Sequence, residues 1–386
     1  MKDARMSRSL PLVALSLGLI AAGPAWAQDV QTPLNAANET CRTNGPNEAR
    51  ITACTYVIAN AQLTRSLLTA SLSNRGQAHR LAGNRDAAMA DFDAALTIDP
   101  EYGFAWMGRG QVLTADGQTQ AAREAYDRAT RFNPRLSTPY IARAEALYSS
   151  GDWAGLVAEA DRMLAAIPDD AYAYRARGWA RMRLNQLDTA LADLDTAVRL
   201  EPNEAASFNV RGQIHQARGD DLRAFGDFDR AVALVPQSVS FLYQRGNTLH
   251  RLRRYADAIA DYEAINRIQA PNATVLNSLC WSRAVWGQQL DQALANCNAA
   301  LGMENGAHIL DSRGLVHLRR GDAAASFADY DAAYRLDPDS ASALYGRGLA
   351  QIRLGREAEG RADIAAAVAK DPKTADNYAG YGVPAP

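Results

Sequence analysis

The chain contains four cysteines, and their positions raise the first question about chemistry. Cys280 and Cys297 lie seventeen positions apart in LCWSRAVWGQQLDQALANC, whereas Cys41 and Cys54 lie thirteen positions apart near the N-terminus. Thiols can bind zinc, carry out redox chemistry or form structural disulfides. The C-x-x-C spacing of a catalytic redox pair is absent. The choice between the other two roles depends on where the cysteines stand in the fold.

Aspartates and histidines are the other side chains that could bind a metal. D-x-D strings occur at 91–93, 193–195 and 227–229. On a helix, residues two apart point about 200° away from each other, so their carboxylates cannot share one ion. The chain has no G-x-S-x-G, P-loop or H-E-x-x-H string. The sequence therefore predicts no catalytic residue, no metal and no cofactor, and hence a protein that is not an enzyme.

Composition limits the classes of partner. Of the 386 residues 48% are apolar and 22% charged, a balance typical of globular proteins, and the formal net charge is −2. No global field attracts nucleic acid or an anionic membrane. We expect protein partners and no nucleic acid.

The first 27 residues have the features of an export signal. A basic start (Lys2, Arg5, Arg8) precedes the apolar run 10–22, and Ala25-Trp26-Ala27 follows as an A-x-A cleavage site. The apolar run is about 13 residues, shorter than the roughly 18–20 that span a bilayer. We expect cleavage after Ala27, export to a bacterial periplasm and no stable membrane insertion, the alternative being an uncleaved anchor.

The rest of the chain is built on a repeat of 34 residues. Prolines recur at 100, 134, 168, 202 and 236 and again at 338 and 372, and glycines recur in step at 76, 110, 178, 212, 246, 314 and 348. Small residues follow twelve positions later, and aromatic or apolar residues four positions after those. Apolar spacings of three and four within each unit predict two amphipathic helices. No useful period-two alternation occurs, so the chain is predicted to be all helix.

This helix–turn–helix pattern resembles the tetratricopeptide repeat. The second unit carries it most completely, with Trp106, Gly110, Ala122, Tyr126, Ala129 and Pro134 in register. The resemblance implies an all-α solenoid of stacked antiparallel helix pairs in a right-handed superhelix. It covers residues 69–374 in nine units: 69–102, 103–136, 137–170, 171–204, 205–238, 239–273, 274–306, 307–340 and 341–374.

The two flanks of the repeat depart from its pattern. Residues 28–68 are predicted to form a diverged extra helix pair, with Cys41 on its first helix and Cys54 in the aromatic slot of its second. The tail 375–386 starts another helix without completing it. Either this tail packs on the ninth unit as a cap, or the last pair is left for a partner to cover.

Charged residues also recur with the period of the repeat. Eight of the nine units have an arginine just before the recurring glycine, and seven of these eight have an acid sixteen residues later, as in Arg211 and Asp227. The arginines could form a ladder that binds phosphates or carboxylates. A matching acid favours the alternative, an ion pair that joins the two helices of each unit. His79, His215 and His317 share one slot of separated units, which favours packed residues over ligands.

The resemblance places a binding groove on the concave face, which is lined mainly by the first helix of each unit. Aromatic and arginine residues dominate binding hot spots, and asparagine or glutamine can pair with a peptide backbone. We predict a peptide- or partner-binding site centred on Trp179, the alternative being that Trp179 only packs between neighbouring helices. Its predicted residues are Tyr148, Tyr172, Arg175, Trp179, Met182, Asn209, Gln213, Tyr243 and Asn247.

The sequence is compatible with three functions. The leading hypothesis is a non-enzymatic scaffold or adaptor of the cell envelope. The second is an accessory subunit of an envelope enzyme system, such as cell-wall or exopolysaccharide assembly. A free-standing enzyme is the third, and it would require turnover by the purified chain.

In register, the cysteine-containing stretch is the seventh unit. Cys280 stands in the arginine slot, Trp281 in the glycine slot, Asn296 in the acid slot and Cys297 in the aromatic slot. Both cysteine slots face the contact between the two helices, so a disulfide accounts for all of these changes. A four-cysteine zinc site is excluded because the two pairs lie in distant units of a one-dimensional stack. We predict the disulfides Cys41–Cys54 and Cys280–Cys297.

Overall fold

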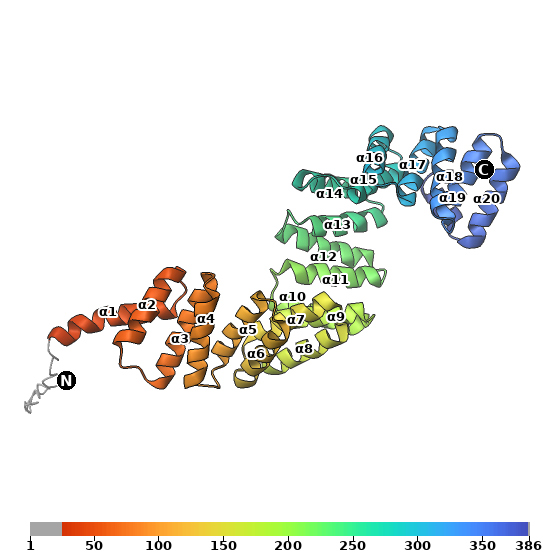
Figure 1. Cartoon of the computed structure of the whole chain (residues 1–386). Helices are drawn as coiled ribbons and strands as arrows, with labels where there is room; N and C mark the ends of the chain where they lie inside the picture. The colour runs from red at the N-terminus through yellow and green to blue at the C-terminus, as the bar shows by residue number, and fades with distance from the viewer. Residues whose placement is uncertain (1–24, 385–386) are drawn as a thin grey trace, which may run out of the picture. The chain divides into compact units, whose positions relative to one another are not determined.

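The computed structural model describes residues 25–384, with side chains from residue 33 onward. Within that range the chain forms helices and no strands (Figure 1). They are α1 (Ala25–Arg42), α2 (Asn47–Asn60), α3 (Arg65–Leu81), α4 (Arg85–Ile98), α5 (Gly103–Ala115), α6 (Thr119–Phe132), α7 (Ser137–Ser150), α8 (Trp153–Ala166), α9 (Ala171–Arg183), α10 (Leu187–Leu200), α11 (Ala205–Ala217), α12 (Asp221–Leu234), α13 (Val239–Arg251), α14 (Tyr255–Ile268), α15 (Ala273–Trp286), α16 (Leu290–Met303), α17 (Ala307–Arg320), α18 (Ala323–Leu336), α19 (Ala341–Arg353), α20 (Glu357–Lys370) and α21 (Thr374–Gly380).

The predicted export signal lies mostly outside the described residues. Only its last three residues are described, and they are the first residues of α1. From residue 25 to residue 384, no helix is long and apolar enough to cross a membrane. The division of the chain into leader, extra pair, nine units and tail stays a prediction.

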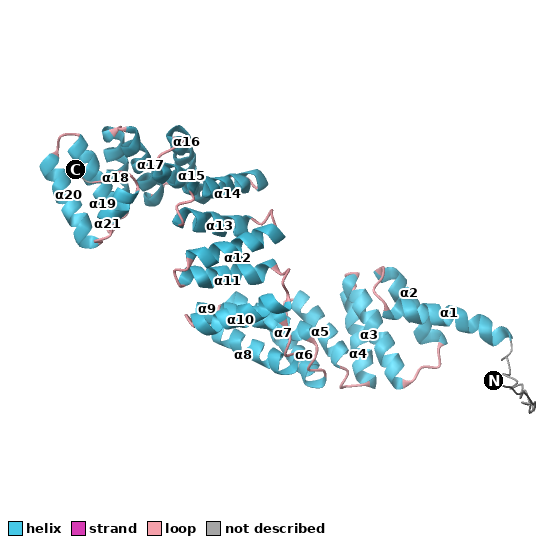
Figure 2. Ribbon diagram, turned by 180° about the vertical axis from the view of Figure 1, so that it is seen from behind, coloured by secondary structure: helices cyan, strands magenta, loops and turns pink. Residues whose placement is uncertain are grey.

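Local sequence explains how each pair forms, as α11 and α12 illustrate. Gly219 takes the left-handed conformation (φ 78°) in the turn between them, which glycine adopts without strain. Asp220 then caps α12 by accepting a hydrogen bond from the backbone N–H of Arg223 at 3.1 Å. Pro236 follows the end of α12 and prevents its continuation. Consecutive helices therefore fold back on each other as antiparallel pairs (Figure 2).

The recurring glycine lets the two helices of a pair approach closely. A Cβ placed on Gly212 would lie 2.8 Å from the ring of Phe228, which is fully buried in the pair. A Cβ on Gly178 would clash with Leu194 Cδ2. The predicted all-α solenoid of stacked helix pairs is confirmed.

The helices form two compact parts, each containing several repeat units; one ends at residue 145 and the other begins at residue 146. In the N-terminal part, Phe92 and Tyr126 are buried between their helices. In the second, the same slot is filled by Leu194, Phe228, Tyr262 and Tyr330, each at most 2% exposed. Each of the two parts therefore has its own core, built from the aromatic or apolar slot of successive repeats.

The structure fits both predicted disulfides. Cys41 of α1 and Cys54 of α2 are joined with their α-carbons 4.8 Å apart. Cys280 of α15 and Cys297 of α16 are joined with their α-carbons 5.5 Å apart. All four cysteines are at most 1% exposed, so both bonds lie inside a helix–helix contact.

The C-terminal tail forms the short helix α21, which packs against α19 and α20 (Figure 2). Tyr378 and Val383 of the tail are 2% and 3% exposed. The last helix pair is therefore covered by the chain itself.

Candidate functional site

Of the arginines that recur just before the glycine slot, which we call the arginine ladder, most form ion pairs inside their own units. Arg211 donates from Nε to Asp227 Oδ2 at 2.9 Å and from Nη2 to Asp227 Oδ1 at 2.6 Å. The same two-point ion pair recurs at Arg75–Asp91, Arg177–Asp193, Arg245–Asp261, Arg313–Asp329 and Arg347–Asp363. Paired donors matched to one carboxylate give geometric specificity as well as energy. The prediction of an ion pair between the two helices is confirmed for these units.

Each arginine also contacts the preceding unit, which the sequence reasoning missed. Arg211 Nη1 donates to Asp195 Oδ1 at 2.9 Å, and Arg245 Nη1 donates to Asp229 Oδ1 at 2.7 Å. The same contact joins Arg109 to Asp93, Arg143 to Asp127, Arg177 to Asp161 and Arg347 to Asp331. In a D-x-D string, the first aspartate therefore serves the arginine of its own unit and the second serves that of the next. The signal was present in the sequence, because six of the eight arginines have an aspartate sixteen residues earlier.

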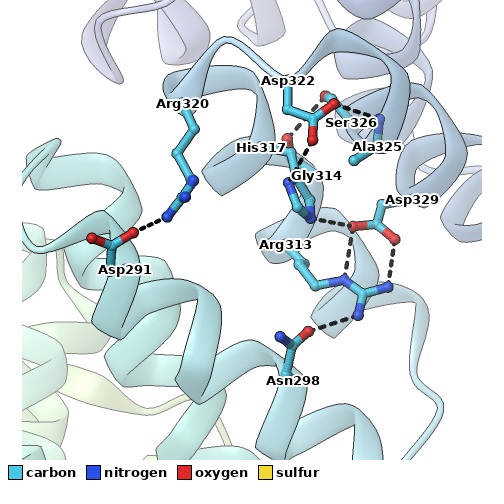
Figure 3. A network of polar contacts seen from close by, with 10 residues as sticks. All are labelled: Asp291, Asn298, Arg313, Gly314, His317, Arg320, Asp322, Ala325, Ser326 and Asp329. Atoms are coloured by element: carbon cyan, nitrogen blue, oxygen red, sulfur yellow. Dashed lines mark hydrogen bonds and ion pairs between the residues drawn. The ribbon is translucent and has the colours of Figure 1, made fainter.

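The seventh unit restores this connection with a different arginine. Arg283, one turn after Cys280, donates from Nη1 to Asn296 Oδ1 at 2.6 Å and forms an ion pair with Glu263 of the preceding unit. Asn298 then accepts a hydrogen bond from Arg313 of the next unit at 2.8 Å (Figure 3). The polar ladder is thus continued by another residue where the disulfide occupies the arginine slot.

Two of the three aligned histidines border the ladder. His317 Nε2 lies 3.7 Å from Asp329 Oδ2, as Figure 3 shows, and His215 Nε2 lies 3.7 Å from Asp227 Oδ2. Burial lowers the pKa of both imidazoles. These histidines pack beside ion pairs of separate units, so the ladder is a structural network.

The predicted site around Trp179 contains an aromatic shelf, which we define as Tyr148, Trp153 and Trp179. The ring of Tyr148 (α7) lies 6.0 Å from that of Trp179 (α9) and meets Trp153 (α8) edge-on at 5.6 Å between centroids. Tyr148 is 50% exposed, and the guanidinium of Arg183 lies 4.9 Å over the Trp153 ring. The shelf therefore offers aromatic surface to solvent with a cation at its edge.

Trp153 was absent from the predicted site. It is the first residue of a second helix, and the prediction took concave residues only from first helices. Its contact with Tyr148 arises because the turn at Gly151 and Asp152 returns the chain beside the end of α7. Only its residue type, a tryptophan next to a turn, could have indicated it.

Two polar atoms of the predicted site lack partners within the part of the chain that the structure describes. Trp179 Nε1 is shielded from solvent but donates no hydrogen bond, and Asn209 Oδ1 on α11 accepts none. Buried polar groups are normally paired, so each such atom calls for an explanation. Both atoms are closed to solvent in this structure, so a ligand can reach them only when the side chains around them move.

The other predicted residues of the site differ in how far their side chains are already held by contacts within the protein. Arg175 lies over the Tyr172 ring at 5.4 Å, and Met182 packs with Trp179 beside a small apolar cluster. Gln213 is half-buried on α11. Asn247 Oδ1 already accepts a hydrogen bond from Tyr262 Oη at 2.7 Å, and Tyr243 packs against the same ring at 6.0 Å. The α13 residues are therefore partly committed to internal contacts.

Comparison with known proteins identifies the family. The pattern of the tetratricopeptide repeat matches residues 73–136, 175–239, 212–273 and 312–375, which together make up more than half of the chain. The chain belongs to the tetratricopeptide-repeat family. Members of this family are generally non-catalytic interaction modules, and the fold suggests a protein–protein interaction scaffold.

Solved structures resemble parts of this tetratricopeptide-repeat protein. YrrB, described as a tetratricopeptide-repeat protein with an unusual peptide-binding site, is 19% identical; the match covers 49% of this chain and 97% of YrrB, with a TM-score of 0.44. A tetratricopeptide repeat protein from Parabacteroides merdae is 14% identical over 73% of this chain and 98% of its own, with a TM-score of 0.45. PilW, a type IV pilus biogenesis factor, is 17% identical over 52% and 92%, with a TM-score of 0.44. No curated protein matches the chain. At these levels of similarity the structures do not bear on what this chain binds.

Proposed function

We propose that this protein is a non-enzymatic scaffold of the bacterial cell envelope that holds an extended segment of a partner protein on the aromatic shelf. The observation that carries the proposal is the aromatic shelf itself, where the half-exposed ring of Tyr148 lies beside Trp179 and the guanidinium of Arg183 lies over Trp153. An extended peptide can pack an aromatic or apolar side chain against these exposed rings.

Export is part of the proposal. The N-terminal 27 residues have the composition of a cleaved signal, and disulfides persist in oxidising compartments such as the periplasm. The two buried disulfides are compatible with that location. An accessory subunit of an envelope enzyme system is the second candidate; it differs by co-purifying with a catalytic partner.

Replacing Trp179 and Arg175 with alanine is expected to reduce partner recovery about thirtyfold when the mature chain is used as bait in an envelope extract. A central tryptophan of a binding site contributes roughly 2 kcal/mol or more, which corresponds to that factor. Trp179→Phe keeps an aromatic ring but reduces its area, so we expect a smaller, measurable loss.

The matched control is Leu222→Ala on α12. Leu222 is 73% exposed and lies on a second helix, away from the shelf residues in sequence and outside the predicted site. Circular dichroism should show equal helix content for all variants. Unchanged recovery with the Trp179 and Arg175 variant would show that the shelf is not the binding site.

A further inference from the structure

The tail makes its main contacts with residues far from it in sequence. Tyr378 reaches Ser342 of α19 and Tyr330 of α18, and Tyr381 meets Trp281 of α15 edge-on at 5.1 Å between centroids. Arg319 of α17 donates a hydrogen bond to the carbonyl of Tyr381. A helix that only capped α20 would not touch α15 and α17. The tail therefore lies across several units at once.

These contacts lie on the face where the repeat places its ligand groove. Asp311 and Arg319 lie on α17, and Ser342 and Tyr345 lie on α19. Both are first helices of their units, which are the helices expected to line the concave face. The Tyr378 ring lies 4.7 Å from that of Tyr345. The tail thus occupies the groove that a partner peptide would use in this part of the chain.

The slot for Tyr378 recognises its hydroxyl as well as its ring. Tyr378 Oη donates to the Ser342 carbonyl at 2.9 Å and lies 3.2 Å from Tyr330 Oη. Ser342 Oγ in turn donates to the carboxylate of Asp311 at 3.0 Å. Removing the hydroxyl would leave the buried Tyr330 hydroxyl without this partner and remove a hydrogen bond to the Ser342 carbonyl, so this slot favours tyrosine over phenylalanine.

The slot for Tyr381 is open on one side. A polar cavity of about 500 Å³ lies between the tail and the α13–α15 region, with Tyr381, His250, Arg253 and Tyr255 among its lining residues. Arg253 keeps the left-handed conformation (φ 60°) that favours glycine, and its guanidinium lies near Gly380 of the tail. The groove therefore extends beyond the part that the tail fills.

The tail has few interactions of its own to hold it in place. Helix α21 has seven residues and no side-chain cap at its N-terminus. Isolated helices of this length do not form in water, so α21 depends on the groove. Its aromatic contacts come from the buried Tyr378 and from Tyr381, which follows the end of the helix.

We propose that the concave face formed by α15–α20 is a second binding site, which accepts a short segment bearing two tyrosines at positions i and i+3, and that residues 374–383 of the chain occupy it until such a partner segment displaces them. This site is separate from the aromatic shelf and does not depend on the function proposed for it. The tail acts as a tethered competitor, whose effective concentration is on the order of millimolar.

Tail docking is expected to weaken as the pH rises from about 4 to about 7 and to be constant above that. Burial raises the pKa of Asp311 to about 7, although the hydrogen bond from Ser342 opposes this shift. The hydroxyls of Tyr330, Tyr378 and Tyr381 are its other titratable neighbours. With the tail released, Asp311 regains solvent and a pKa near its usual value, so docking takes up a proton between the two pKa values. Hydrogen exchange of residues 374–383, corrected for the intrinsic rate, measures this; Asp311→Asn should remove the dependence.

The test of the site uses the full mature chain with a specific protease site inserted after Lys370. The chain is cleaved after folding and the released tail is removed by dialysis. A fluorescent peptide of residues 371–386 is then titrated onto cleaved and intact protein. We expect the cleaved protein to bind it at least tenfold more tightly, because the tethered tail no longer competes.

Peptide variants provide the specificity control. Tyr378→Ala and Tyr381→Ala should each weaken binding at least tenfold, Tyr378→Phe should weaken it less, and Ala379→Ser, at an exposed position, should not. Binding should also persist in the Trp179→Ala protein, which separates this site from the shelf. In the intact chain, Tyr381→Ala should loosen the tail and increase binding of the wild-type peptide.

Three results would overturn the proposal. The cleaved protein could lose its helix content when the tail departs, the tail could fail to exchange with labelled peptide, or binding could ignore both tyrosines. The first two would make α21 a fixed cap of the fold. The third would show that the groove does not recognise this segment.

Discussion

Replacing Asp227 with alanine is expected to destabilise the repeats around α11 and α12 by about 3–5 kcal/mol, because it leaves Arg211 without its main partner. Asp227 is only 6% exposed and receives both donors of the Arg211 fork. The neighbouring carboxylate in the same D-x-D string, Asp229, is 54% exposed and pairs with one nitrogen of Arg245. Asp229→Ala should therefore cost less than about 1 kcal/mol.

These two variants form a matched pair, since they remove the same group two residues apart on one helix. A long repeat array need not unfold in two states, so local stability should be read from hydrogen exchange of α11 and α12 alongside the urea midpoint. The double variant Arg211→Met with Asp227→Leu should recover most of the loss, because buried ion pairs can be replaced by apolar groups at little cost. Equal losses for Asp227→Ala and Asp229→Ala would contradict the structural role assigned to the buried pair.

Removing the disulfide of the seventh unit should have the second large effect. Replacing Cys280 and Cys297 together with alanine is expected to cost about 3 kcal/mol, which is the chain-entropy contribution of a loop of this length. The bond stands where other units have an arginine–acid pair, and Arg283 supplies only a partial replacement through Asn296 and Glu263. Exchange should therefore accelerate first in α15 and α16.

The corresponding variant of Cys41 and Cys54 is the control, because it should accelerate exchange in α1 and α2 and leave α15 and α16 unchanged. A thiol assay on the wild-type protein under denaturing conditions should detect no free thiol. Four free thiols would disprove both disulfides, and a loss well below 1 kcal/mol would show that the seventh unit is stable without its bond.

Much of the fold could be predicted from the sequence because each unit repeats the same local spacings. Within one pair, helix periodicity and a turn of constant length set which positions face each other. Arg211 therefore meets Asp227 sixteen residues later, and Cys280 meets Cys297 seventeen residues later. The same logic placed Trp179 on a first helix with Tyr148 nearby, although their contact distance required the structure.

Contacts between neighbouring units were harder to predict from the sequence. The pairing of Asp195 with Arg211 crosses from one unit to the next, and Arg283 takes over from the missing arginine by a shift of one turn. Trp153 joins the aromatic shelf from the start of a second helix. Each depends on how neighbouring pairs are rotated against each other, which a spacing rule within one pair does not contain.

The sequence by itself determined the helix pairs, the arginine–acid pairs of most units and the positions of the disulfides, since all of these follow from short-range periodicity. Only the tertiary structure decided that Tyr378 and Tyr381 pack against residues of several earlier helices. Their partners lie as far away as Trp281, one hundred positions earlier. Small rotations accumulated over several stacked pairs bring these residues together, and no local pattern records that sum.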